Sequence, residues 1–180
     1  MSERFWSKPS VEPKRSFRWV FTLSGQSNKL ETYAIKTVKK PSYTVSEVPH
    51  QFVAHTFYYP GRVTWNPIDV TFVDPVHPDQ SLAITNMFVQ AGYRVPKNQE
   101  IALSSFSKER FVAAIGQPVI RQLDADGKDI EIWTLNNCFF TNIDYGQLDY
   151  GSEDLVINSV TLRFDYATLE IPGENSKLTP

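Results

Sequence analysis

The chain has 180 residues and a formal net charge of −2, and aromatic residues make up 13% of it. Proteins that bind nucleic acid through its phosphates usually carry an excess of basic residues. The slightly negative net charge therefore argues against binding of this kind, although not against nucleic acid passing nearby. One cysteine excludes a disulfide framework within the chain, and no apolar run reaches the length of about 18 residues that a membrane-spanning helix needs.

The N-terminal part predicts an arm followed by two strands. Residues 1–16 contain two prolines and a basic cluster and lack the apolar core of a signal peptide, so we expect an extended N-terminal arm. Residues 17–25 alternate apolar and polar side chains, which predicts a strand, and residues 31–38 predict a second one. The apolar side of the first strand consists of Phe17, Trp19, Phe21 and Leu23.

Residues 40–61 predict a long two-stranded ribbon whose apolar side chains are mostly aromatic. Such a ribbon is marginally stable by itself, so we expect it to lie against either its own barrel or a partner. Residues 62–73 predict a further strand region, in which Pro67 indicates an edge, a bulge or a break, and the Asp74–Pro75 pair ends it.

The next segment predicts two helices. The main helix covers 79–93, with Asp79 as its N-cap, and a shorter one covers 107–115, between Ser107 as cap and Gly116 as stop. The expected apolar stripe of the main helix consists of Leu82, Ile84, Phe88, Ala91 and Val95.

The C-terminal part predicts strands again. Residues 117–123 and 130–138 form a hairpin, because the Asp126–Gly127 pair between them is a strong turn signal. Residues 155–171 are rich in alternating apolar side chains and close the domain. The residues by themselves therefore predict a β-rich domain with one main helix.

Chemistry-bearing motifs are scarce, and we expect no catalytic residues, no metal and no cofactor. His50 and His55 are five residues apart, which predicts opposite faces of one strand instead of a converging metal site. The acidic stretch from Asp124 to Glu131 fails the spacing of a calcium loop, and Cys138 is expected to be a small buried residue.

Four carboxylates gather in one segment: Asp144, Asp149, Glu153 and Asp154. A pair of them could perform acid–base chemistry. The alternatives are a solvated loop or a wall that repels phosphates.

A family resemblance runs through residues 130–167. They contain, in order, a Trp-x-Leu-x-Asn strand, an Ile-Asp step, a Gly-x-Leu-x-Tyr turn, a Ser-x-Asp pair and an alternating strand that ends in Tyr beside Asp. The matching positions are Trp133, Leu135, Asn137, Asp144, Gly146, Leu148, Tyr150, Ser152, Asp154, Val160, Leu162, Phe164, Asp165 and Tyr166. Together with residues 60–72, this set resembles the tail tube protein family of contractile-tailed bacteriophages, which is related to the haemolysin-coregulated tube protein of type VI secretion.

The resemblance implies a mainly β fold, a β-barrel or sandwich of two antiparallel sheets with one flanking α-helix. The expected domain covers residues 17–172, with a C-terminal tail at 173–180. It also implies a structural, non-enzymatic subunit: six copies form a ring, and rings stack into a tube through which DNA passes. The implied partners are further copies of the chain, a surrounding sheath protein, and baseplate and neck proteins at the ends. The implied location is the virion tail, assembled in the bacterial cytoplasm, with no membrane partner.

The ribbon and the acidic segment supply the candidate site residues. Aromatic side chains are favoured at interfaces, so the expected contacts between subunits or rings are Tyr43, Val45, Phe52, Phe57, Tyr58 and Tyr59. A lumen lined by carboxylates would let DNA slide without sticking, and the candidates are Asp144, Asp149, Glu153 and Asp154.

Two other functions stay open at this point. The chain could be a component at the end of a tube, such as a baseplate tube initiator, or a type VI secretion tube. A small-ligand-binding β-barrel, or a hydrolase built on such a barrel, is the alternative from another class, and a pocket with converging polar groups would favour it.

Overall fold

The computed structural model describes residues 12–23, 25, 30–103 and 105–173. Residues 1–11 of the expected N-terminal arm and residues 174–180 of the expected C-terminal tail therefore lie outside the described residues.

Two four-stranded antiparallel sheets form the body, which confirms the predicted fold class. The first sheet has the order β1 (Trp19–Thr22), β6 (Val119–Leu123), β7 (Asp129–Asn136), β10 (Tyr166–Glu170). The second has the order β2 (Ile35–Val38), β5 (Ile68–Val73), β9 (Ile157–Arg163), β8 (Phe139–Asp144). A separate two-stranded sheet consists of β3 (Tyr43–Phe52) and β4 (His55–Trp65).

The core consists of side chains that alternate along the strands of both sheets. Val70 pairs with Val160 across the β5–β9 ladder, and Ile68 pairs with Leu162, and all four side chains are fully buried. Phe21, Ile120 and Leu135 fill the core from the first sheet, although Phe17, expected on the same face as Phe21, is exposed. Alternation of this kind buries one face of each sheet, because successive strand side chains point to opposite sides.

Residues 155–171 form two strands in different sheets. β9 ends at Arg163 and β10 begins at Tyr166, so the chain changes sheets at Phe164 and Asp165. Asp165 stabilises the connection between the two strands. Its carboxylate accepts hydrogen bonds from Lys108 and Asn137, and its backbone N–H donates to the carbonyl of Asn136.

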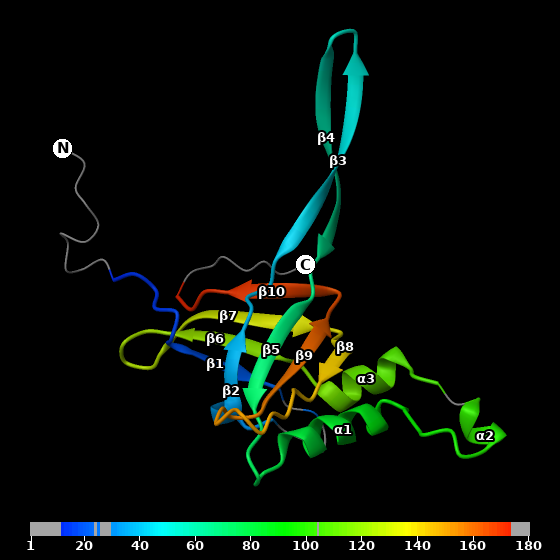
Figure 1. Ribbon diagram of the computed structural model, residues 1–180. Helices are drawn as coiled ribbons and strands as arrows, with labels where there is room; N and C mark the ends of the chain where they lie inside the picture. Colours follow the sequence, from blue (N-terminus) through cyan, green and yellow to red (C-terminus); the bar gives the residue numbers. More distant parts are fainter. Residues whose placement is uncertain (1–11, 24, 26–29, 104, 174–180) are drawn as a thin grey trace.

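Three helices lie on one side of the body, at the lower right of Figure 1: α1 (Gln80–Gln90), α2 (Gln99–Ala102) and α3 (Lys108–Ile115). Asp79 and Ser107 cap α1 and α3 as predicted, each accepting a hydrogen bond from a backbone N–H three residues on. α3 packs against α1 and β8. None of the helices in the described ranges is long and apolar enough to cross a membrane.

The apolar stripe of α1 differs from the predicted one. Ile84 and Ala91 are buried as expected, but Leu82 and Val95 are 57% and 61% exposed. The buried stripe runs through Gln80, Ile84, Met87 and Ala91, a helical spacing that leaves Leu82 on another side. Val95 lies beyond the end of the helix.

Element boundaries also differ from the sequence-based expectation, most of all in the regions 31–38 and 62–73. The predicted strand at 31–38 begins with a turn of 3-10 helix (Thr32–Ala34), and only Ile35–Val38 is extended. The predicted strand region 62–73 is divided at Asn66 and Pro67, so its first residues belong to the ribbon, which therefore spans 43–65. Pro67 acts here as a break, one of the three roles expected for it.

Candidate assembly surfaces

The β3–β4 ribbon projects away from the two sheets, at the top of Figure 1. All side chains from Tyr43 to Thr64 are exposed. Nine of them are large and apolar: Tyr43, Val45, Val48, Phe52, Val53, Phe57, Tyr58, Tyr59 and Val63. Monomeric proteins rarely expose so much contiguous apolar surface, and such patches mark interaction sites. The ribbon therefore does not lie against its own barrel, which was one of the two expected arrangements.

The register of the ribbon divides its outer half into two unlike faces. Residues paired across the two strands share a face, and the faces alternate along each strand. One face, here called the tip face, carries Val48, His50, Phe52, His55, Phe57 and Tyr59. The other carries Glu47, Pro49, Gln51, Thr56, Tyr58 and Pro60. The rings of His50 and Tyr59 lie edge to face, with centroids 6.4 Å apart, in agreement with this assignment.

The expected contact residues therefore fall into three groups. Phe52, Phe57 and Tyr59 share the tip face, whereas Tyr58 lies on the opposite face beside Pro49. Tyr43 and Val45 lie at the base of the ribbon, paired with Trp65 and Val63. A sequence reading that treats residues 57–59 as one aromatic patch misses this division.

The two ribbon histidines correct an expectation. We predicted that His50 and His55 lie on opposite faces of one strand, but they lie on two strands and on the same face, because a turn at Val53 and Ala54 separates them. Among the described residues, no group of three histidine, cysteine or carboxylate side chains is placed to hold a metal ion.

A β-bulge marks the boundary between base and outer half. Val45 pairs with Val63 and Glu47 pairs with Pro60, so Gly61 and Arg62 together oppose Ser46. The Ser46 hydroxyl accepts a hydrogen bond of 2.8 Å from the Arg62 N–H, and a Cβ on residue 61 would lie 2.3 Å from that oxygen. A side chain at 61 would therefore displace the Ser46 hydroxyl from this hydrogen bond. The extra residue changes which β4 side chains share a face with those of β3.

The base of the ribbon is attached to the body by aromatic packing. The Trp65 ring lies 5.8 Å from that of Phe164 in the core and 5.2 Å from that of Tyr43. Asn66 donates its backbone N–H to the Ser42 carbonyl at 2.8 Å, which ties the two ends of the ribbon together.

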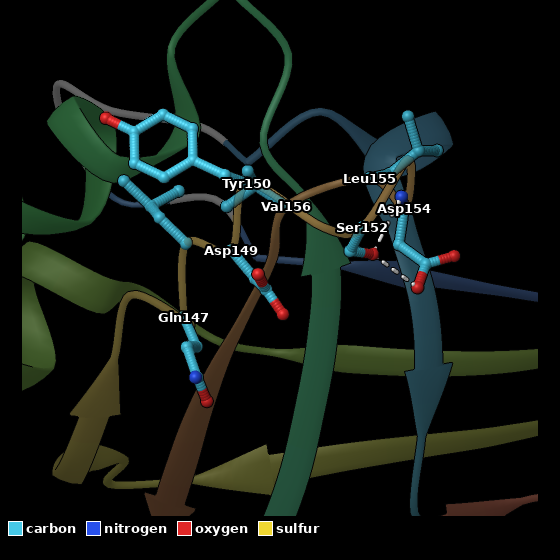
Figure 2. Close-up of a pocket in the computed structure, with 8 residues that line it drawn as sticks. Gln147, Asp149, Tyr150, Ser152, Asp154, Leu155 and Val156 are labelled. Atoms are coloured by element: carbon cyan, nitrogen blue, oxygen red, sulfur yellow. Dashed lines mark hydrogen bonds between the residues drawn. The ribbon is translucent and has the colours of Figure 1, made fainter.

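The four candidate lumen carboxylates are all exposed, at the end of β8 and in the loop between β8 and β9. Figure 2 shows two of them, Asp149 and Asp154. Asp144 and Asp149 accept hydrogen bonds of 2.9 and 2.8 Å from the N–H groups of Gly146 and Gly151. Asp154 accepts a hydrogen bond from the Ser152 hydroxyl at 2.9 Å. The loop surrounds a depression of about 550 Å³. Each aspartate is engaged by its own local turn, so the loop shows no converging acid–base pair.

Gly146 determines how this acidic loop leaves β8. Its φ angle is 77°, in the left-handed region, and a Cβ there would lie 2.5 Å from the carbonyl oxygen of Ile157. Any other residue would push the loop away from β9.

Sequence reasoning missed the role of Glu131, a buried carboxylate on β7 that joins distant segments. Its two oxygens accept hydrogen bonds from Lys14 and, at 2.7 Å, from Lys40, and the Trp133 indole N–H also donates to it. Burial by itself would raise the pKa of Glu131, but the hydrogen bonds from Lys14, Lys40 and Trp133 outweigh burial and lower the pKa to about 2. Only its position between two isoleucines hinted at burial, and its lysine partners are far away in sequence.

Glu131 should make the free energy of unfolding depend on pH. Its pKa is lower in the folded chain, so the folded state gains stability above the unfolded-state pKa of 4.5 and loses it as pH falls toward about 2. Both lysines are about half exposed, so we expect Glu131→Gln to cost about 2 kcal/mol at pH 7. Urea unfolding of both proteins between pH 7 and pH 2 measures this. The difference should shrink below pH 4.5, and a constant difference would show that the charge of Glu131 contributes nothing.

Cys138 is buried, as expected from its sequence context. Burial, with a smaller contribution from the charge of Asp165, raises the pKa of its thiol to about 12. The thiol is therefore unreactive at neutral pH.

Two packed antiparallel sheets, flanking helices and a projecting ribbon give this chain the tail-tube fold, as the family resemblance implied. A chain of the anti-feeding prophage baseplate has this fold with a TM-score of 0.65 and 15% identity, covering 91% of this chain and 99% of that one. A chain of the extended sheath–tube complex of PVC, an extracellular contractile injection system, gives a TM-score of 0.63 and 16% identity, with coverages of 94% and 99%.

The SPP1 tail tube also shares the fold, with a TM-score of 0.56, 10% identity and coverages of 90% and 81%. At these identities the likeness establishes the fold alone. No protein-family model and no curated protein matches the sequence.

Proposed function

We propose that this chain is a structural subunit of a tail tube, in a phage tail or a related contractile injection apparatus. Copies form rings of six that stack head to tail into a conduit for DNA, inside a sheath and between baseplate and neck proteins in the virion tail. The observation that carries the proposal is the exposed apolar ribbon on a tail-tube fold. A surface that projects from one end and fits a site elsewhere on the next copy produces an open, stacking assembly.

The tip of the ribbon supports a contact role. The hairpin turn contains Val53 and Ala54, where a tight turn open to water usually has Asn-Gly or Asp-Gly. Val53 has a φ of 53° and is 93% exposed. A β-branched residue is strained in that region, and such strain is typical of functional positions. We infer that the turn carries an apolar side chain because a partner covers it.

A component at the end of a tube is the second candidate. Chains with this fold also occur in structures of the anti-feeding prophage tube-terminating cap and the PVC sheath/tube terminator, with TM-scores of 0.62 and 0.63. An end component would form one ring without stacking further.

Negative-stain electron microscopy of the purified chain over a concentration series tests both candidates. Stacked rings or long tubes with a central pore support the tube subunit, and single rings support the end component. Particles that stay monomeric at every concentration, also after addition of preformed baseplate, would contradict both.

The acidic loop provides a test of the conduit. The variant D144N/D149N/E153Q/D154N should assemble normally, because asparagine keeps the acceptor oxygens of the turns at Asp144 and Asp149. If the loop lines the lumen, the neutral tubes should retain a short fluorescent DNA duplex at 50 mM salt while wild-type tubes release it, because repulsion between like charges is lost.

The matched control neutralises the same number of exposed carboxylates elsewhere, as E100Q/E109Q/D126N/E170Q. It should behave like the wild type. Equal DNA retention by both variants would mean that net charge, and not the loop, decides the outcome, whereas loss of assembly in the loop variant would place the loop at a subunit contact.

A further inference from the structure

The N-terminal strap, defined as residues 12–18, is held along the first sheet by specific hydrogen bonds. The buried side chain of Gln122 on β6 donates to the carbonyl oxygens of Arg15 and Arg18, at 2.6 and 2.9 Å. The Arg18 carbonyl also accepts the N–H of Leu123 at 3.0 Å. Within the strap, Arg18 forms an ion pair with Glu12 at 2.8 Å. The strap is therefore a docked segment with a definite path.

The ribbon leaves the body through the linker from β2, residues 39–42. The Lys39 N–H donates to the Asp69 carbonyl at 3.2 Å, which attaches the linker to β5, the neighbour of β2 in the second sheet. Lys40 reaches the other sheet, where its ammonium group lies 2.7 Å from Oε1 of Glu131 on β7. This ion pair connects the beginning of the ribbon with the sheet that carries the strap.

The same carboxylate binds both segments. Lys14 of the strap donates to Oε2 of Glu131, and Lys40 of the linker donates to Oε1. The Glu131 side chain is 9% exposed, so the two ammonium groups meet a nearly desolvated anion. The Trp133 indole N–H also donates to Oε1, which leaves Lys14 as the donor to Oε2. If Lys14 leaves, one oxygen loses its donor and the carboxylate is freer to rotate, which makes the position of Lys40 less defined.

Small changes at the base of the ribbon become large at its tip. β3 has 10 residues, so the ribbon is about 34 Å long at about 3.4 Å per residue. A rotation of about 5° at the base therefore moves the tip by about 3 Å. A displacement of this size is enough to misplace aromatic anchors in a well-packed interface.

We propose that Glu131 is a positioning residue that couples docking of the N-terminal strap to the direction in which the ribbon leaves the body. A chain with its strap displaced holds the ribbon less firmly, so the strap regulates how well the tip is placed for contact. The consequence for assembly rests on the proposed function, whereas the coupling itself is a property of the isolated chain.

Spin labels at the ribbon tip and on the body measure this coupling directly. Thr56→Cys and Glu109→Cys place labels at two exposed positions, one on the ribbon opposite the tip face and one on α3, and buried Cys138 stays unlabelled. Pulsed electron spin resonance on the monomer, diluted with unlabelled chain, gives the distribution of tip-to-body distances. We expect Lys14→Met to shift or broaden this distribution by about 3 Å, the lever estimate above, and Glu131→Gln to do so at least as strongly.

Two further variants separate this coupling from a general loss of structure. Glu12→Gln removes the other ion pair of the strap without touching Glu131 and should leave the distribution unchanged. Lys14→Arg keeps the cation and should restore the wild-type distribution. If Lys14→Met leaves the distance distribution unchanged, the proposal is overturned. This holds even if Glu131→Gln changes the distribution, because Glu131 would then position the ribbon without the strap. These distances are measured on the monomer, so the result does not depend on whether the chain forms tubes.

Discussion

Replacing Tyr59 by serine should raise the concentration at which the chain assembles by about 10- to 100-fold, equivalent to about 1.4–3 kcal/mol per contact. Tyr59 lies on the tip face with Phe57 and Val48, two further exposed apolar side chains. Aromatic anchors contribute most of the binding energy of interfaces, so their removal is costly. Sedimentation of the purified chain over a concentration series measures the effect.

Tyr58 offers a matched control for this experiment. It is the adjacent residue, it has the same side chain, and its exposure of 63% is close to the 58% of Tyr59. It lies on the opposite face, beside Pro49, so Tyr58→Ser should change the assembly concentration by less than about threefold. Equal effects of the two substitutions would show that the ribbon does not bind through one face. Circular dichroism should show both variants folded, because neither side chain is in the core.

Replacing Asp74 by alanine should lower the free energy of unfolding by about 3 kcal/mol, which corresponds to a melting temperature lower by about 6–12 °C at this chain length. Asp74 follows β5 and accepts hydrogen bonds from the N–H groups of Gln80 and Ser81 at the start of α1, at 3.0 and 3.3 Å. It also accepts from the Ser81 hydroxyl and from the amide of Asn158 on β9, the latter at 3.1 Å. One carboxylate thus joins the end of a strand, a helix N-terminus and the neighbouring strand.

The cost is large because the partners are buried. Gln80 and Asn158 are each 1% exposed, so their polar groups have little access to water when Asp74 is removed. Asp74→Asn keeps one acceptor oxygen for the helix N-terminus but presents an amide to the donors of Ser81 and Asn158, so we expect about half of the loss. Thermal unfolding at pH 7 checks both values. A change below about 0.5 kcal/mol in Asp74→Ala would contradict the assigned role.

Low pH should lower the free energy of unfolding of the wild-type chain, as Asp74→Ala does at pH 7, but by a smaller amount. Burial tends to raise the pKa of Asp74, but hydrogen bonds from Ser81, Gln80 and Asn158 outweigh it and lower the pKa below 3.8. The stabilisation is therefore fully present above the ordinary pKa of 3.8 and is lost as pH falls through the lower folded value. Asp74→Ala should show a correspondingly weaker dependence on pH in this range.

Local features of the sequence predicted the structure best where only one helix or strand was involved. The caps at Asp79 and Ser107 and the break at Pro67 follow from backbone chemistry that needs no distant partner. The apolar alternation in residues 155–171 indicated extended structure, and Val160 and Leu162 on β9 are buried, but it did not show that the chain changes sheets at Phe164 and Asp165. The stripe of α1 was harder, because Gln80 is buried through hydrogen bonds to Glu31 and Pro78, which hydrophobic periodicity does not register.

The sequence by itself determined that this is a mainly β chain with an aromatic ribbon and an acidic loop, because period-2 patterns, turn residues and caps act within a few residues of each other. Only the tertiary structure decided which aromatic side chains of the ribbon share a face, since one bulge at Gly61 and Arg62 changes the alternation of a whole strand. Only the tertiary structure brought Lys14 and Lys40 to Glu131, because ion pairs between distant segments leave no periodic trace in the sequence. Pairing partners depend on how the sheets pack, and that arrangement is specified by the whole chain.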